Sequence, residues 1–142
     1  MRLWRLTRAA YADLNGEGAR RYGGRWNSPG WAVVYAAAEA ALAVLEVRVH
    51  LDLPLDLLPD DDVLLTIETG DPRPEEGPAL SDPIECRAYG DRWLTEQRSA
   101  LLVVPSVIVP ESRDVLMNPA HPDALGIHIV HSRPWTFDPR LF

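Results

Sequence analysis

Two stretches of the 142-residue chain combine residue types that could bind or transform a charged ligand. The first is the segment 23–30, Gly-Gly-Arg-Trp-Asn-Ser-Pro-Gly, whose two leading glycines allow the backbone to turn tightly and to approach a ligand. Its arginine, Arg25, carries a planar fork of donors that suits a phosphate or carboxylate group. The alternative interpretation is a surface turn in which Arg25 pairs with one of the many acidic residues.

The second stretch places a carboxylate among apolar neighbours. Glu46 lies within Ala41–Val47, where every other residue is alanine, leucine or valine. A carboxylate half-buried in such surroundings is costly unless it is paired or functional. The alternative is that Glu46 faces solvent beside Glu39 and Arg48. Tyr35, in Val-Tyr-Ala, has the neighbours of an ordinary core tyrosine.

The remaining composition excludes several kinds of chemistry. All fourteen basic residues are arginine, so the chain cannot use a Schiff-base or Walker-type lysine. Cys86 is the only cysteine, which excludes a disulfide framework and a cysteine zinc site. His128 and His131 stand three positions apart in a predicted strand, so they point to opposite faces and cannot chelate one metal ion. We therefore expect no metal site.

The elements that must position these residues form an α+β pattern. Helices are predicted from Ala36 to the residues before Pro54 and over Glu85–Gln97. In the first helix, Leu42, Leu45 and Val49 fall on one face. Alternating or β-rich segments predict strands, and these cover residues 3–7, 31–35, 63–68, 101–105, 107–110 and 126–131. The length suits one compact domain.

The charge is unevenly distributed along a chain whose net charge is −7. Residues 1–25 carry six arginines against two acidic residues, whereas residues 50–85 carry eleven acidic residues against one arginine. An acidic chain does not track a phosphate backbone, so we expect no direct nucleic-acid binding, although the basic front end suits a small anion. No apolar run is long enough to span a membrane and no secretory leader opens the chain, so we expect a cytoplasmic protein.

A series of motifs, taken in order, resembles the RES domain family, which is named for its arginine, glutamate and serine. The motifs are Gly18-Ala19, Gly24 to Gly30, Val34-Tyr35-Ala36, Ala41 to Glu46, Leu102 to Pro110 and Asn118-Pro119-x-His121-Pro122. The resemblance runs from Leu3 to Phe142 and implies a single RES domain over residues 1–142. It also implies an ADP-ribosyltransferase-like fold, in which helices flank a split antiparallel β-sheet similar to that of diphtheria-toxin-like enzymes.

The resemblance further implies an activity. RES proteins are toxins of bacterial toxin–antitoxin pairs, and they consume NAD+ as a substrate by hydrolysis, by phosphorolysis or by ADP-ribosylating a protein. We therefore expect an enzyme that cleaves the nicotinamide–ribose bond of NAD+ and needs no cofactor. Two alternatives are a mono-ADP-ribosyltransferase that modifies a cellular enzyme, and a non-catalytic binding module with a decayed NAD+ site.

The resemblance assigns roles to individual residues. Carried over by motif, the catalytic residues are Arg25, Tyr35, Glu46 and a serine. The same arginine, tyrosine and glutamate are also expected to contact NAD+, together with Trp26 and Asn27. The serine is expected to be Ser106, in Pro-Ser-Val-Ile-Val, with Ser99 as the alternative. The implied partner is an Xre-like antitoxin that blocks the NAD+ pocket, with the toxin dimeric within that complex.

Overall fold

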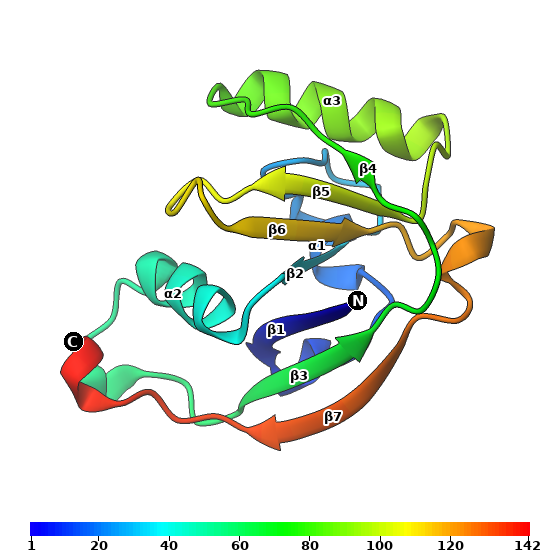
Figure 1. The fold of residues 1–142 in the computed structure, drawn as a ribbon. Helices are drawn as coiled ribbons and strands as arrows, with labels where there is room; N and C mark the ends of the chain where they lie inside the picture. The colour runs from blue at the N-terminus through cyan, green and yellow to red at the C-terminus, as the bar shows by residue number, and fades with distance from the viewer.

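The computed structural model describes residues 1–142, and a seven-stranded β-sheet organises them (Figure 1). The strands are β1 (Arg2–Arg8), β2 (Val34–Ala37), β3 (Asp62–Glu68), β4 (Glu75–Glu76), β5 (Leu101–Pro105), β6 (Arg113–Met117) and β7 (His128–Pro134). Their order across the sheet is β4-β5-β6-β2-β1-β3-β7. Each neighbouring pair is antiparallel except the short β4, which runs parallel to β5.

The sheet is divided into two halves between β2 and β1. These strands share a single registered pair, Trp4 with Ala37, whereas β1 pairs with β3 over its whole length, from Arg2 to Arg8. One half therefore contains β4, β5, β6 and β2, and the other contains β1, β3 and β7. Figure 1 shows the two halves diverging from this junction. The split antiparallel sheet expected from the sequence is thus present, with the β4–β5 pair as its one parallel exception.

Three α-helices accompany the sheet, and they are α1 (Glu17–Tyr22), α2 (Ala40–His50) and α3 (Pro83–Thr95). Helix α3 lies over the β4–β5 end of the sheet, and α2 lies against β1 and β2 (Figure 1). Asp82 caps α3 by accepting the Ile84 N–H at 2.9 Å, and Pro83 occupies the first helical position, where no N–H is required. None of these helices combines the length and apolar character needed to cross a membrane.

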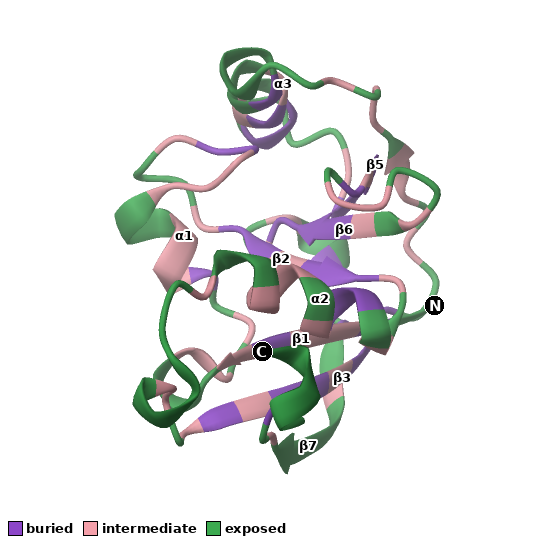
Figure 2. Cartoon of the chain, turned by 90° about the vertical axis from the view of Figure 1, so that its left-hand side faces the viewer, coloured by how far each residue is buried: buried purple, intermediate pink, exposed green.

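The core lies on both faces of the sheet, which explains the continuous apolar run of β5. Leu101 and Val103 pack into the larger cluster with residues of β1, β3 and β6, while Leu102 and Val104 point to the opposite face beneath α3. A strand covered on both faces is apolar at every position rather than at alternate ones. Figure 2 shows the buried residues concentrated in the central strands and on the inner side of α3.

Several sequence predictions were wrong in detail. The strand expected at 31–35 is displaced to 34–37, because Ala36 and Ala37 pair with β6, and α2 consequently begins at Ala40. Residues 107–110 form a loop rather than a strand, and the unpredicted strand β6 follows at 113–117. The short helix α1 lies in a stretch that the sequence left irregular.

The expected apolar face of α2 was also wrong. Leu42 is buried, with 4% of its surface exposed, but Leu45 and Val49 are 37% and 54% exposed. The packed side instead includes Ala43 and Val47. Because α2 is apolar nearly all round, spacing alone could not identify the side that meets the sheet.

Candidate active site

A cavity of about 800 Å³ opens where the two halves of the sheet diverge. Its walls come from β1, β2, β6, α1, α2 and the segment 23–26, and most of its lining side chains are hydrophobic. This volume lies within the range of small-molecule and cofactor sites, which are typically apolar with a few converging polar groups. Four of the predicted site residues line this one cavity: Arg25, Trp26, Tyr35 and Glu46.

The loop that carries Arg25 is fixed from its interior by Asn27. The Asn27 side-chain amide donates to the carbonyls of Ala19 and Trp31 at 3.0 and 3.2 Å, and Asn27 is 0% exposed. The following residue is held by α3, because the Ser28 N–H and hydroxyl donate to the two carboxylate oxygens of Asp91 at 2.8 and 2.5 Å. Hydrogen bonds therefore hold the turn on two sides, and its conformation does not depend on a ligand.

Arg25 makes no ion pair. Its Nη2 donates to the Ser81 carbonyl at 2.9 Å, while its buried Nε has no hydrogen-bond partner. The alternative of a surface turn in which Arg25 pairs with an acidic residue was therefore wrong. A buried donor without a partner is costly, and such groups in a cavity wall are suited to receiving an acceptor from a ligand.

Tyr35 fastens β2 to this loop. Its hydroxyl donates to Asn27 Oδ1 at 2.6 Å and accepts the Trp26 backbone N–H at 3.0 Å. Burial raises the pKa of the Tyr35 phenol well above its ordinary value, so the ring stays neutral. Gly24 makes this arrangement possible, because a Cβ at that position would lie 2.6 Å from the Tyr35 hydroxyl oxygen.

The two remaining members of the loop motif differ in position. Trp26 lines the cavity, although it is only 4% exposed, and its ring meets that of Tyr89 edge to face. Asn27 does not line this cavity, and its side-chain groups are occupied by protein partners. Because its amide is engaged in holding the loop, Asn27 supports the site through the backbone rather than by lining the cavity.

Glu46 reaches the cavity from α2 and meets the predicted serine. The Ser106 hydroxyl donates toward Glu46 Oε2 at 3.5 Å and accepts the N–H groups of Ile108 and Val109, each at 3.2 Å. Arg48, the surface partner considered for Glu46, instead donates to the Leu141 carbonyl at 2.7 Å. The solvent-facing alternative for Glu46 was therefore wrong.

The alternative serine lies elsewhere. Ser99 accepts the Trp93 indole N–H at 2.9 Å and donates to the Leu101 carbonyl at 2.7 Å. Both contacts belong to the packing of α3 on β5, and Ser99 does not line the cavity. Of the two serines, Ser106 alone contacts Glu46.

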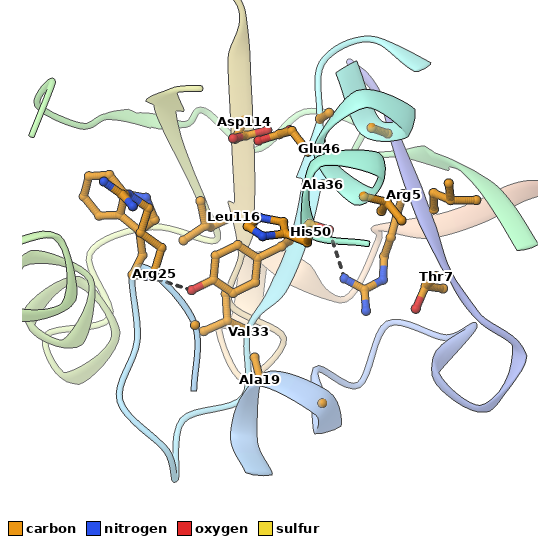
Figure 3. A pocket seen from close by; sticks show the side chains of 18 of the residues that line it. Arg5, Thr7, Ala19, Arg25, Val33, Ala36, Glu46, His50, Asp114 and Leu116 are labelled. Carbon is orange, nitrogen blue, oxygen red and sulfur yellow. Dashed lines mark hydrogen bonds between the residues drawn. The ribbon is translucent and has the colours of Figure 1, made fainter. Parts of the chain in front are cut away.

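Two charged residues of the cavity were missed by the sequence reasoning. Arg5 on β1 lines it, with Nη1 donating to the Tyr35 carbonyl at 3.0 Å and a buried Nε without a partner. Burial lowers the pKa of Arg5 from its ordinary value. Figure 3 shows Arg5 and Arg25 on opposite sides of the site. The sequence did carry one indication of this role, because Arg5 stands between the apolar residues Trp4 and Leu6 of a predicted strand.

The second missed residue is Asp114 on β6, whose carboxyl group lies against that of Glu46 (Figure 3). Burial, and then the hydrogen bond and the charge of Glu46, raise the pKa of Asp114 to about 9.

No group of three or more His, Cys, Asp or Glu side chains is arranged to hold a metal ion. The cavity thus combines two arginines, a neutral phenol and a pair of carboxyl groups within mostly apolar walls.

This geometry places the chain in a class of folds. The structure resembles one chain of the MbcT–MbcA toxin–antitoxin complex of M. tuberculosis, with a TM-score of 0.78 and 23% identity. The match covers 99% of this chain and 85% of the similar chain. The α+β architecture, with a cleft at the split of its sheet, is therefore the ADP-ribosyltransferase-like fold.

Sequence comparison defines the family within that class. The RES domain family matches residues 2–139, and this chain belongs to it. The "Prs ADP-ribosylating toxin" of Sphingobium sp. (strain YBL2) is 44% identical over 97% of this chain and 94% of its own length. The "Toxin Res" of Pseudomonas putida (strain KT2440) is 41% identical over the whole of both chains.

Proposed function

We propose that this chain is the toxin of a toxin–antitoxin pair and that it cleaves the nicotinamide–ribose bond of NAD+. The observation that carries the proposal is the convergence of Arg25, Tyr35 and Glu46 on one cavity of about 800 Å³. These residues come from a loop, a strand and a helix, so their meeting is a property of the fold. Two similar proteins carry toxin names, which supports the toxin part of the proposal.

The reaction needs little acid catalysis. The C–N bond breaks with both electrons passing to the pyridinium ring, so that neutral nicotinamide leaves without being protonated. The ribose is left with oxocarbenium character, as in glycoside hydrolysis, and a nucleophile then bonds to its anomeric carbon. One carboxylate, Glu46, would hydrogen-bond the ribose hydroxyls and stabilise the developing positive charge. Apolar walls strengthen that interaction, because they exclude water.

The other cavity residues would bind and orient the dinucleotide. The Tyr35 ring would stack on the nicotinamide and limit its rotation, while its hydroxyl remains engaged with the loop. Arg25 and Arg5 both line the cavity, and their guanidinium groups would bind the phosphate oxygens. Ser106 would hold Glu46 rather than contact the reacting atoms, since its hydroxyl points toward Glu46 Oε2.

A second candidate is protein mono-ADP-ribosylation. The relative that is 44% identical carries the name "Prs ADP-ribosylating toxin", so the nucleophile in this chain would then be a protein side chain rather than water or phosphate. Bond cleavage and the roles above are the same in each case. The third possibility, a binding module with a decayed site, is disfavoured because the arginine, tyrosine and glutamate of the motif are all in place around the cavity.

One experiment separates these outcomes. The purified chain is incubated with NAD+ labelled in the adenylate half, with and without inorganic phosphate, and then with a bacterial lysate. Free ADP-ribose indicates hydrolysis, its phosphate ester indicates phosphorolysis, and label fixed on protein indicates a transferase. If NAD+ remains intact under all three conditions, the proposed enzymatic function is wrong.

The proposed partner is an antitoxin protein. The similar MbcT fold was crystallised with MbcA in a toxin–antitoxin complex, and we infer a corresponding partner for this chain. An Xre-like antitoxin that occludes the cavity, together with a dimeric toxin, remains the form implied by the family resemblance. Co-expression with the adjacent gene product, followed by measurement of the complex mass, tests both points.

A further inference from the structure

Two carboxyl groups from different elements meet in the wall of the cavity. Glu46 lies in the middle of α2 and Asp114 lies near the start of β6, and their carboxyl groups are hydrogen-bonded to one another. Figure 3 shows them at the same edge of the site. A hydrogen bond between two carboxyl groups requires a proton on one of them, so the pair holds a proton that the mechanism described above does not use.

The neighbours of Asp114 offer no positive charge to balance a second carboxylate. Across the sheet it is paired with Ala37 on β2 and Val104 on β5. From α2 it meets Glu46, and His50 lines the same cavity one turn further along. The next residue on its own strand, Arg113, turns away and donates to the Pro110 carbonyl at 3.1 Å. The only charged group found to influence the ionisation of Asp114 is Glu46.

These surroundings determine which partner carries the proton. Burial disfavours the charged form of Asp114, and the hydrogen bond and charge of Glu46 disfavour it further, so that the pKa of Asp114 rises to about 9. Asp114 therefore carries the proton at neutral pH and is the donor of the hydrogen bond to Glu46. Two adjoining carboxylates commonly divide their roles in this way, because like charges in contact cannot both form.

We propose that Asp114 is a positioning residue, whose protonated carboxyl group donates a hydrogen bond that holds the Glu46 carboxylate in place for the sugar. The Ser106 hydroxyl donates toward Glu46 Oε2, so Glu46 is held from two sides. Because the Asp114 donor is neutral, it holds Glu46 without offsetting the negative charge of that carboxylate. An arginine or lysine in the same position would partly neutralise the charge that the developing sugar cation requires. The inference rests on the proposed NAD+ cleavage for its catalytic consequence.

The substitution Asp114→Asn tests this role, because an amide also donates a hydrogen bond but cannot ionise. We expect kcat/KM for NAD+ loss to stay within about threefold of the parent at pH 7. Asp114→Leu removes the donor and is expected to lower kcat by about tenfold to a hundredfold, the usual effect of losing a hydrogen bond to a charged group. An inactive but folded Asp114→Asn protein, or a fully active Asp114→Leu protein, would overturn the proposal.

The pH profile separates positioning from a purely structural role. Parent activity is expected to fall as the pH approaches and passes about 9, where Asp114 loses its proton and repels Glu46. The Asp114→Asn variant is expected to lack this alkaline loss. An identical alkaline limb in the two proteins contradicts the assignment of the proton to Asp114.

A stability measurement keeps the test independent of NAD+ chemistry. Since the pKa of Asp114 is raised on folding, the folded state binds more protons than the unfolded state between about pH 4 and pH 9, and stability falls as the pH rises through that range. The melting temperature of Asp114→Asn minus that of the parent should therefore increase from pH 5 to pH 9. Substitution of the exposed Asp71 by asparagine is the control and should give a constant difference. A constant difference for Asp114→Asn overturns the shared-proton arrangement, even if the parent chain does not consume NAD+.

Discussion

The phenol of Tyr35 and the side-chain amide of Asn27 are joined by a 2.6 Å hydrogen bond that ties strand β2 to the loop bearing Arg25. The same phenolic oxygen accepts the Trp26 N–H, so one hydroxyl satisfies two buried groups of the loop. Tyr35, which we propose stacks on the nicotinamide, thus also holds the loop that carries Arg25.

Replacement of Tyr35 by phenylalanine separates these two roles. The aromatic ring remains for stacking, but the Trp26 N–H and the side-chain oxygen Oδ1 of Asn27 lose their shared partner. We expect the free energy of unfolding to fall by about 1–3 kcal/mol, which is the cost of leaving a buried polar group unpaired. Urea unfolding measures this change, and Tyr22→Phe on the exposed surface of α1 serves as the control. Equal stability of the two variants would show that the loop does not depend on the hydroxyl.

Replacement of Glu46 by glutamine is expected to abolish most NAD+ cleavage. The substitution removes the negative charge that would stabilise the oxocarbenium-like sugar, and the loss of one such electrostatic contact lowers kcat by about a hundredfold or more. The rate of nicotinamide release measures the effect, while circular dichroism checks the fold. Glu39→Gln, at the exposed N-cap of the same helix, is the matched control. A parent-like rate in Glu46→Gln rules out this assignment.

Replacement of Arg25 by alanine is expected to raise KM more than it lowers kcat. Arg25 lines the cavity from the loop 23–26, and a phosphate contact would contribute mainly to binding. Steady-state kinetics at several NAD+ concentrations measure both constants. Arg21→Ala, which removes an exposed arginine paired with Glu17, provides the comparison. An unchanged KM with a collapsed kcat would instead place Arg25 at the reacting centre.

Replacement of Arg5 by methionine is expected to weaken NAD+ binding and to lower the stability modestly, because the Tyr35 carbonyl loses its donor. The methionine keeps most of the side-chain volume, and the change removes a buried guanidinium whose Nε has no partner. Calorimetry should show an affinity reduced by about tenfold, the usual scale for a lost charge-assisted hydrogen bond. Arg2→Met, at an exposed position of the same strand, should leave the affinity unchanged. Unaltered binding in Arg5→Met would remove Arg5 from the ligand contacts.

Replacement of Gly90 by alanine tests how tightly α3 is docked on the loop. A Cβ at Gly90 would lie 1.7 Å from the Trp26 carbonyl oxygen, so the helix or the loop must move. Overpacking of this kind costs about 1–3 kcal/mol. Gly126→Ala is the control, because a Cβ there meets no atom within 4 Å. Thermal unfolding should separate the two variants, and a similar melting temperature for both would contradict the close contact.

Residue type and local pattern were sufficient to predict much of the fold and the site. The alternation in Leu3–Thr7 predicted β1, and the order of motifs that resembles the RES family singled out Arg25, Tyr35 and Glu46, which line one cavity. The loop's glycine, Gly24, is likewise explained by its direct approach to the Tyr35 hydroxyl.

The residues that were missed depend on contacts between distant segments. Asp114 has no unusual neighbours in the sequence, and its importance arises because β6 pairs with β2 and brings it to α2. The place of Asn27 depends on the fold for a related reason, since nothing in the loop motif distinguishes an amide that faces the cavity from one that faces the loop's interior. The buried side of α2 was hidden by its nearly uniform apolar composition.

The single residue pair that joins β1 to β2 has a mechanical consequence. Arg5 belongs to one half of the sheet, and Arg25 belongs to a loop fastened to the other half through Tyr35. A dinucleotide bound by both guanidinium groups would link the two halves of the sheet across this junction. Bound substrate would then stabilise the folded state, so the occupied chain would resist heat and proteolysis better than the empty one.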